Sequence, residues 1–399
     1  MICLSLRATE GSAAISMRYI RAFGRLFVWA ALLAGAGAGV CQTIETRGQL
    51  SAWLAFHKSQ ESESLIGIRA LPAFSLKQEL GRTALDTEAS FNVYGLAALR
   101  GSQSFSTDGR IKPYRLWARF STPRFEARLG LQKINFGSAL LLRPLMWFDR
   151  IDPNDPLQLT DGVYGALARY TFVGNANIWI WGLLGNTDAK GWEFVPTKSR
   201  TPEFGGRFQV PFLSGEAAFS FHHRLMDPSR SLLPLPVEEA ERVPENRFAL
   251  DGKWDIGAGV WFEGVLVHQD FRLYPFRYQR FLNLGADYTF GLGSGLHVIA
   301  EHLISSSSDQ ALGGGESLRF TAVSADYPLG LLDRIKAVVF HNWKSGDWYR
   351  LITWQRTYDK WSFFAIGFWN PDRYQIYASQ QGKNLFAGKG IQIMAVFNY

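Results

Sequence analysis

The last ten residues of the chain have the pattern of an amphipathic β-strand that ends on an aromatic side chain. One face of this period-two repeat carries Ile391, Ile393, Ala395, Phe397 and Tyr399, and the other carries Gln392, Met394, Val396 and Asn398. An unpaired strand at a chain end exposes backbone groups that promote aggregation. The pattern therefore predicts a paired strand, either the closing strand of a barrel or an ordinary core strand.

This ending resembles the C-terminal signal by which bacterial outer-membrane barrels are recognised for assembly. The resemblance implies that Phe397 and Tyr399 form the assembly signal and that the barrel-assembly machinery is a partner. A barrel has no free edge, because its last strand closes against its first. The rest of the chain must then supply the other strands.

Residues 1–41 are predicted to be a leader with a cleavable signal peptide. Its basic group consists of Arg18, Arg21 and Arg25. An apolar run from Leu26 to Leu33 and a tail of small residues follow, and this run is too short to cross a bilayer as a helix. Met17 is an alternative start of the chain, and cleavage is expected after Ala38 or Cys41. Acylation of Cys41 is not expected, because Val40 is larger than the residue that usually precedes a lipidated cysteine.

Composition excludes several classes of protein. The only cysteines are Cys3 and Cys41, which excludes a disulfide scaffold and a zinc-thiolate site in the exported chain. The 14 Trp and 14 Tyr suit the aromatic girdles of a membrane barrel. The net charge of +7 comes partly from the leader, and no basic helix or RNA-binding aromatic signature accompanies it. We expect no nucleic-acid partner.

Residues 42–399 divide into about 18 amphipathic runs, within a range of roughly 16–18, which is typical of a transmembrane barrel. The links between them alternate in length. The long, polar links are expected at 101–113, 135–162, 185–203, 227–246, 305–316 and 370–389. Most of the intervening links are tight turns such as Pro123-Arg124. The sequence therefore predicts one domain, an all-β transmembrane antiparallel up-and-down β-barrel with long loops at one end.

Charged residues on the alternate face of many runs predict a wet interior, and a barrel of this size leaves an aqueous channel. The turn at Pro123-Arg124 places Arg119 opposite Arg128, and Arg169 is expected at a similar height. Arg115 and Arg207 are expected to extend this row. A row of lumen arginines would attract carboxylate or phosphate solutes. The alternative is a solvated wall whose charge is balanced by Glu126.

The longest link, 135–162, begins with an apolar segment that should not stay in water, so we expect it to fold into the barrel. Its charged residues, together with the arginine row, are predicted to line a constriction. They are Arg143, Asp149, Asp152, Asp155 and Asp161. Asp152, Asn154 and Asp155 also offer oxygen ligands, but the spacing of a calcium loop is absent. We therefore expect no metal site.

The run from Arg128 to Gly137, followed by Asp152 to Pro156, resembles a segment of porin-type barrels, including the alginate-export-like group. In that group an Arg-x-Gly-x-Gln motif precedes a Gly and an Asn/Asp-Pro turn. Leu131 and Phe136 depart from such barrels. The resemblance implies a barrel with an arginine-containing pore and does not identify a substrate.

Five histidines fall near the upper ends of odd-numbered runs: His57, His223, His268, His302 and His341. Such positions can meet outer-membrane lipid and the phosphates of lipopolysaccharide, and the alternative is that they are ordinary interfacial residues. Glu301-His302 near several serines gives only a weak hydrolase signal, because no Gly-x-Ser-x-Gly or His-Glu-x-x-His motif is present.

The sequence therefore predicts an outer-membrane channel that passes small hydrophilic, anionic solutes without a cofactor and without catalysis. The alternative is a structural or surface-assembly barrel that binds extracellular polysaccharide or a partner protein through its long loops. A lumen that the loops fill completely would favour the alternative. The solute and the oligomeric state cannot be derived from the sequence.

Overall fold

The computed structural model describes residues 42–58, 62–100, 104–149, 151, 155–231, 243–270, 277–372 and 386–399. These residues form one closed antiparallel sheet of 18 strands, so the predicted barrel and its strand number are confirmed. Closure occurs where β1 (Gln42–Lys58) pairs with β18 (Lys389–Asn398). The predicted leader, residues 1–41, lies outside the described residues.

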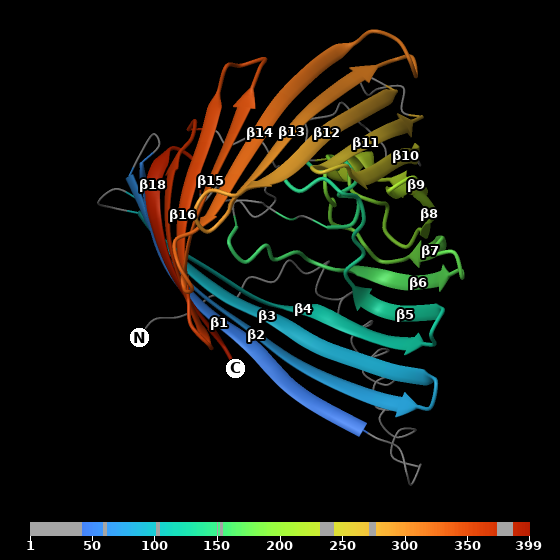
Figure 1. Ribbon diagram of the computed structural model, residues 1–399, viewed down its shortest axis with the longest axis horizontal. Coiled ribbons are helices and arrows are strands. Elements are labelled where there is room, and N and C mark those ends of the chain that lie inside the picture. Colours follow the sequence, from blue (N-terminus) through green and yellow to red (C-terminus); the bar gives the residue numbers. More distant parts are fainter. Residues whose placement is uncertain are drawn as a thin grey trace.

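Each strand pairs with the strands before and after it in the chain (Figure 1). The strands between the two that close the barrel are β2 (Ser62–Leu80), β3 (Thr83–Arg100), β4 (Ser104–Ser121), β5 (Phe125–Gln132), β6 (Val163–Thr171), β7 (Asn177–Leu183), β8 (Glu203–Phe212), β9 (Gly215–Met226), β10 (Val243–Asp255), β11 (Gly259–Gln269), β12 (Tyr278–Phe290), β13 (Leu296–Ser308), β14 (Glu316–Pro328), β15 (Asp333–Asn342), β16 (Trp348–Thr357) and β17 (Trp361–Trp369). The described helical structure is a single 3₁₀ turn, η1 (Pro228–Arg230). Within the described ranges, no helix has both the length and the apolar character needed to cross a membrane.

The outer surface of the barrel is apolar, as contact with lipid requires. In β18, Ile391 and Ile393 are each 58% exposed, whereas their neighbours Gln392 and Met394 face inward and are buried. The same alternation places exposed Phe and Leu side chains on the outer face of β8 to β10. The C-terminal pattern therefore has the two faces that its sequence predicts.

Link lengths alternate around most of the barrel, with tight turns such as 122–124 at one end and links such as 133–162 at the other. The expected long link at 101–113 is wrong. β4 begins at Ser104 and pairs with β3 along its whole length. Asp108, Gly109 and Pro113 gave this part of the strand a loop-like composition.

The inner wall has two different sides. On β3 to β6 it carries charged residues, whereas on β14 to β18 it carries a buried apolar cluster that includes Phe340, Phe368 and Met394. The predicted wet interior is therefore wrong for β14 to β18, where apolar residues occupy the inward positions. Figure 1 shows the green segments that follow β5 and β7 running inside the curved sheet.

Candidate functional site

The link between β5 and β6, which contains the predicted inward loop 135–162, crosses to the opposite wall. Glu301 of β13 accepts hydrogen bonds from the backbone N–H groups of Leu140 and Leu142, both at 2.6 Å. Glu263 of β11 accepts one from Ala139 at 2.7 Å. Buried backbone N–H groups need hydrogen-bond partners, so these two glutamate side chains hold the loop inside the barrel.

One apolar part of this loop packs on the apolar side of the inner wall. Leu141 and Leu142 belong to the same buried cluster as Phe340 and Phe368, and Trp192 packs against that cluster. Burial of these side chains removes the apolar surface that the loop would otherwise expose to water. Other apolar residues of the loop, such as Phe136 and Trp147, belong to a second buried cluster with residues of β6, β7, β10 and β11, so the loop contacts both sides of the barrel interior.

Three of the predicted arginines lie together on the charged wall. Arg119 and Arg128 are direct cross-strand neighbours, and Glu126, which pairs with Arg169, faces the same side. Glu126 lies 3.6 Å from Arg119, 3.1 Å from Arg128 and 4.0 Å from Arg169. Asp86 accepts two further hydrogen bonds from Arg119, at 2.7 and 2.9 Å. Two carboxylates thus meet three guanidinium groups, which leaves an excess of one positive charge.

Tryptophan rings hold these guanidinium groups against the wall. The Arg128 and Arg119 groups lie 4.8 and 5.7 Å from the Trp117 ring centroid, and the Arg169 group lies 3.8 Å from that of Trp179. These cation–π contacts help to hold the three guanidinium groups at the wall. Sequence reasoning did not identify either tryptophan.

A β-bulge keeps further basic residues on this wall. Ser90 pairs with Arg115 whereas the next residue of β3, Phe91, pairs with Pro113, so Tyr114 is the extra residue in β4. An extra residue reverses the alternation of faces. As a result, two residues of β4 that are an odd number of positions apart can face the same side of the sheet when the bulge lies between them.

Contacts with the inward loop show that Lys112, which precedes the bulge, and Arg115, which follows it, both face the lumen. Lys112 forms an ion pair with Asp161 at 2.7 Å, and Arg115 donates to the carbonyl oxygen of Thr160 at 3.0 Å. Asp161 thus opposes a basic residue, although its partner is Lys112 and not one of the predicted arginines. Arg115 has no carboxylate partner among the hydrogen bonds of the described residues.

Arg207 does not extend the row. It is buried in β8 and forms two hydrogen bonds with Asp251 of β10, at 2.6 and 2.8 Å. A paired and buried guanidinium cannot offer its N–H edge to a passing solute. The prediction that Arg207 extends the row is therefore wrong. Alternation along a strand predicts which face a side chain occupies but not which residue it pairs with.

The predicted constriction residues have different surroundings. Arg143 and Asp149 are both buried and paired with each other at 3.2 Å, so they stiffen the loop and do not line a path. Burial raises the pKa of the Asp155 carboxyl, against the opposing effects of a hydrogen bond from the Leu157 N–H and the charge of Arg69. Asp152 lies outside the described residues.

A second inward segment, between β7 and β8, is held by a buried ionic network that sequence reasoning missed. Lys190 binds Glu203 at 2.9 Å, and Arg224 and Arg247 bind Glu193 at 3.1 and 2.7 Å. Glu245 accepts from both arginines. The network contains equal numbers of acidic and basic groups, as burial demands.

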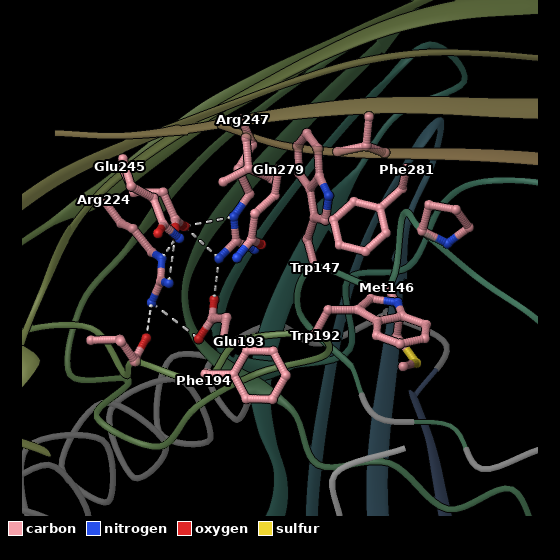
Figure 2. A pocket seen from close by; sticks show the side chains of 15 residues that line it. Met146, Trp147, Trp192, Glu193, Phe194, Arg224, Glu245, Arg247, Gln279 and Phe281 are labelled. Carbon is pink, nitrogen blue, oxygen red and sulfur yellow. Dashed lines mark hydrogen bonds and ion pairs between the residues drawn. The ribbon is translucent and has the colours of Figure 1, made fainter. Parts of the chain in front are cut away.

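Figure 2 shows four members of this network, Glu193, Arg224, Glu245 and Arg247, on one side of a pocket and aromatic rings on the other. The rings belong to Trp147, Trp192, Phe194 and Phe281, and Gln279 lies between the two sides. The pocket holds about 30 Å³, enough for about two water molecules.

The histidines do not form one set. His57 faces inward, 3.3 Å from Glu63, so the expected lipid contact is wrong for this residue. His223, His268 and His341 occupy the outer face near the loop ends of their strands, whereas His302 faces outward from the middle of β13.

The structure bears on two other kinds of site, a hydrolase site and a metal site. Glu301 is buried inside the barrel whereas its neighbour His302 faces outward, so they cannot share a hydrolytic site. No cluster of metal-ligating side chains occurs among the described residues.

No protein-family model and no curated protein matches the chain. Among solved structures, OccK7 (OpdD) of Pseudomonas aeruginosa is similar with a TM-score of 0.53 and 10% identity, covering 89% of this chain and 99% of that one. An anion-selective porin from Comamonas acidovorans gives a TM-score of 0.48 and 11% identity, covering 90% and 100% of the two chains. Wzi of Escherichia coli, a carbohydrate-binding outer-membrane barrel involved in capsule assembly, gives 0.49 and 12%, covering 88% and 84%.

The likeness to OccK7 shows the fold, and the weaker two superpositions add nothing to it. The chain therefore has the fold of an outer-membrane β-barrel. The resemblance to the alginate-export-like group finds no support in these comparisons.

Proposed function

We propose that this protein is a channel of the bacterial outer membrane that passes small hydrophilic anions. The observation that carries the proposal is the basic inner wall, where the bulge at Tyr114 allows Lys112, Arg115 and Arg119 to face the lumen together. Arg128 and Arg169 continue this wall onto β5 and β6. A water-filled path beside such a wall lowers the barrier for anions.

The test is ion selectivity of the purified protein in planar bilayers. A reversal potential that indicates anion preference in a salt gradient supports the proposal. The preference for anions should weaken as the salt concentration rises, because salt screens charges over about 10 Å at 0.1 M. A cation-selective pore would show that loop carboxylates such as Asp161 dominate, and an absence of conductance would exclude the channel.

A second candidate is a surface barrel that binds extracellular polysaccharide. Its support is the pocket of Figure 2, where the aromatic rings of Trp192 and Phe281 lie 5.9 Å apart beside Glu193 and Arg247. Aromatic faces and charged hydrogen-bonding groups together suit sugar rings. The pocket is small, so its walls would have to move apart to admit a sugar.

This candidate predicts that Trp192→Ala weakens binding of capsular polysaccharide to whole cells and leaves conductance unchanged. Trp348→Ala is the matched control, because that ring lies on the lipid-facing surface. Equal binding by both variants would exclude the pocket as a sugar site.

A further inference from the structure

A row of cations crosses the seam where the barrel closes. Arg350 of β16 pairs with Trp369 of β17, Trp369 pairs with Lys389 of β18, and Lys389 pairs with Lys58 of β1. Direct cross-strand neighbours share one face of a sheet. All four residues are exposed on the outer surface, at the end of the barrel that carries the long links.

The four strands that carry this row place no carboxylate beside it. β16, β17 and β18 contain no acidic residue, and the single acid of β1, Glu45, lies near the opposite end of that strand. Like charges directly opposite each other destabilise a strand pair. An anion that bridges Lys58 and Lys389 would therefore relieve their repulsion.

The surroundings of the row indicate what kind of anion fits. The next outward residues toward the middle of the barrel are Ile391 on β18 and Phe56 on β1, which are 58% and 57% exposed. The Trp369 indole, 47% exposed, lies between the cations at the level where girdle aromatics meet headgroups. The site thus presents positive charge directly beside lipid-facing apolar surface, which suits an anion that carries a hydrocarbon chain.

We propose that Lys58, Lys389 and Arg350 form a binding site for the phosphate groups of an outer-leaflet glycolipid. The acyl chains of the lipid would lie along Phe56 and Ile391 while its phosphate bridges β18 and β1. A lipid bound in this way neutralises the charged seam and strengthens barrel closure. The proposal depends on placement in the outer membrane but not on conduction through the lumen.

The test uses the purified full chain in neutral detergent, with diphosphoryl lipid A as the probe. Thermal unfolding is followed through the heat-modifiable band on gels, since a ligand that binds the folded state raises the midpoint. Lipid A should raise the midpoint of the wild type. Lys58→Gln with Lys389→Gln should weaken the apparent affinity about 30-fold, from roughly 1 kcal/mol for each cation near an anionic surface.

The matched control is Arg356→Gln with Lys360→Gln, which removes two positive charges at the short-turn end of the barrel. This control should respond to lipid A as the wild type does. If the double variant at the seam does not fold, Lys389→Gln alone should lower the affinity about fivefold.

Three results would overturn the proposal. The seam variants could keep the wild-type response to lipid A, which would show that these cations do not bind it. Dephosphorylated lipid A could act as well as the diphosphoryl form, which would leave only the apolar contact. Inorganic phosphate could stabilise the protein equally, which would indicate a site for free anions and not for a lipid.

Discussion

Arg119 and Arg128 face each other directly across the β4–β5 hairpin, and both guanidinium groups contact the single carboxylate of Glu126. A like-charged pair in this position is favourable only with a shared counterion. Glu126 therefore neutralises part of the row, as the alternative interpretation of the sequence expects. The row retains net positive charge because Arg169 shares the same carboxylate.

Replacement of Arg119, Arg128 and Arg169 by Gln should move the reversal potential of the channel toward cation preference. Polarity and approximate size remain, but three positive charges are lost while Asp86 and Glu126 stay. Single-channel conductance should change less than selectivity. The opposite substitution, Glu126→Gln, should increase anion preference. An unchanged potential in both variants would show that this wall is structural.

Glu301→Gln should loosen the inward loop. The amide oxygen replaces a carboxylate that accepts hydrogen bonds from consecutive backbone N–H groups at Leu140 to Leu142. A hydrogen bond to a charged group contributes about 1.5–3 kcal/mol, so exchange of these amide hydrogens should accelerate about 10- to 150-fold. Glu316→Gln, which removes an exposed partner of Lys344, is the control and should have no effect there. If these amide hydrogens are equally protected from exchange in both variants, Glu301 does not hold the loop in place.

Much of this architecture follows from local sequence. Alternation of apolar and polar residues located the strands, and tight turns such as Pro123-Arg124 set the register that brings Arg119 opposite Arg128. These features depend on neighbours within one hairpin, and period-two patterns encode them directly.

The remaining features depend on contacts between distant parts of the chain. The bulge at Tyr114 interrupts the period-two pattern, and Pro113 beside it reads as a loop residue. The partners of Arg207 and Glu301 lie on other strands or in the loop, at separations along the chain that no local pattern fixes. The aromatic inward residues of β14 to β18 could not be told from lipid-facing ones, because both faces of those strands are apolar.

Glu245→Ala should destabilise the barrel strongly. Arg224 and Arg247 would remain buried without one of their shared carboxylates. Removal of one partner from a buried ion pair costs about 3–5 kcal/mol. Urea unfolding of the refolded protein in vesicles measures the loss. Glu79→Ala, which breaks an exposed pair with Lys77, should have little effect on stability, because solvent screens an ion pair at the surface. Similar losses in the two variants would mean that the network is solvated.

Deletion of Tyr399 tests the assembly signal. Tyr399 and Gly48 exchange two backbone hydrogen bonds, each of 3.0 Å, at the end of the closing seam. The Tyr399 ring covers Gly48 so closely that a Cβ there would lie 2.3 Å from it. Deletion therefore removes both hydrogen bonds and an aromatic ring that faces lipid. The amount of the folded, heat-modifiable form in outer membranes should fall, whereas Tyr399→Phe should keep it near wild type.

Two explanations of such a fall can be separated by refolding the purified deletion variant into lipid vesicles without assembly factors. If Phe397 and Tyr399 act as a recognition signal, the variant refolds almost as well as the wild type and fails only in cells. If Tyr399 acts by fastening β18 to β1, the variant refolds poorly in vesicles as well. If the amount of folded protein is unchanged both in cells and in vesicles, Tyr399 has no role in assembly.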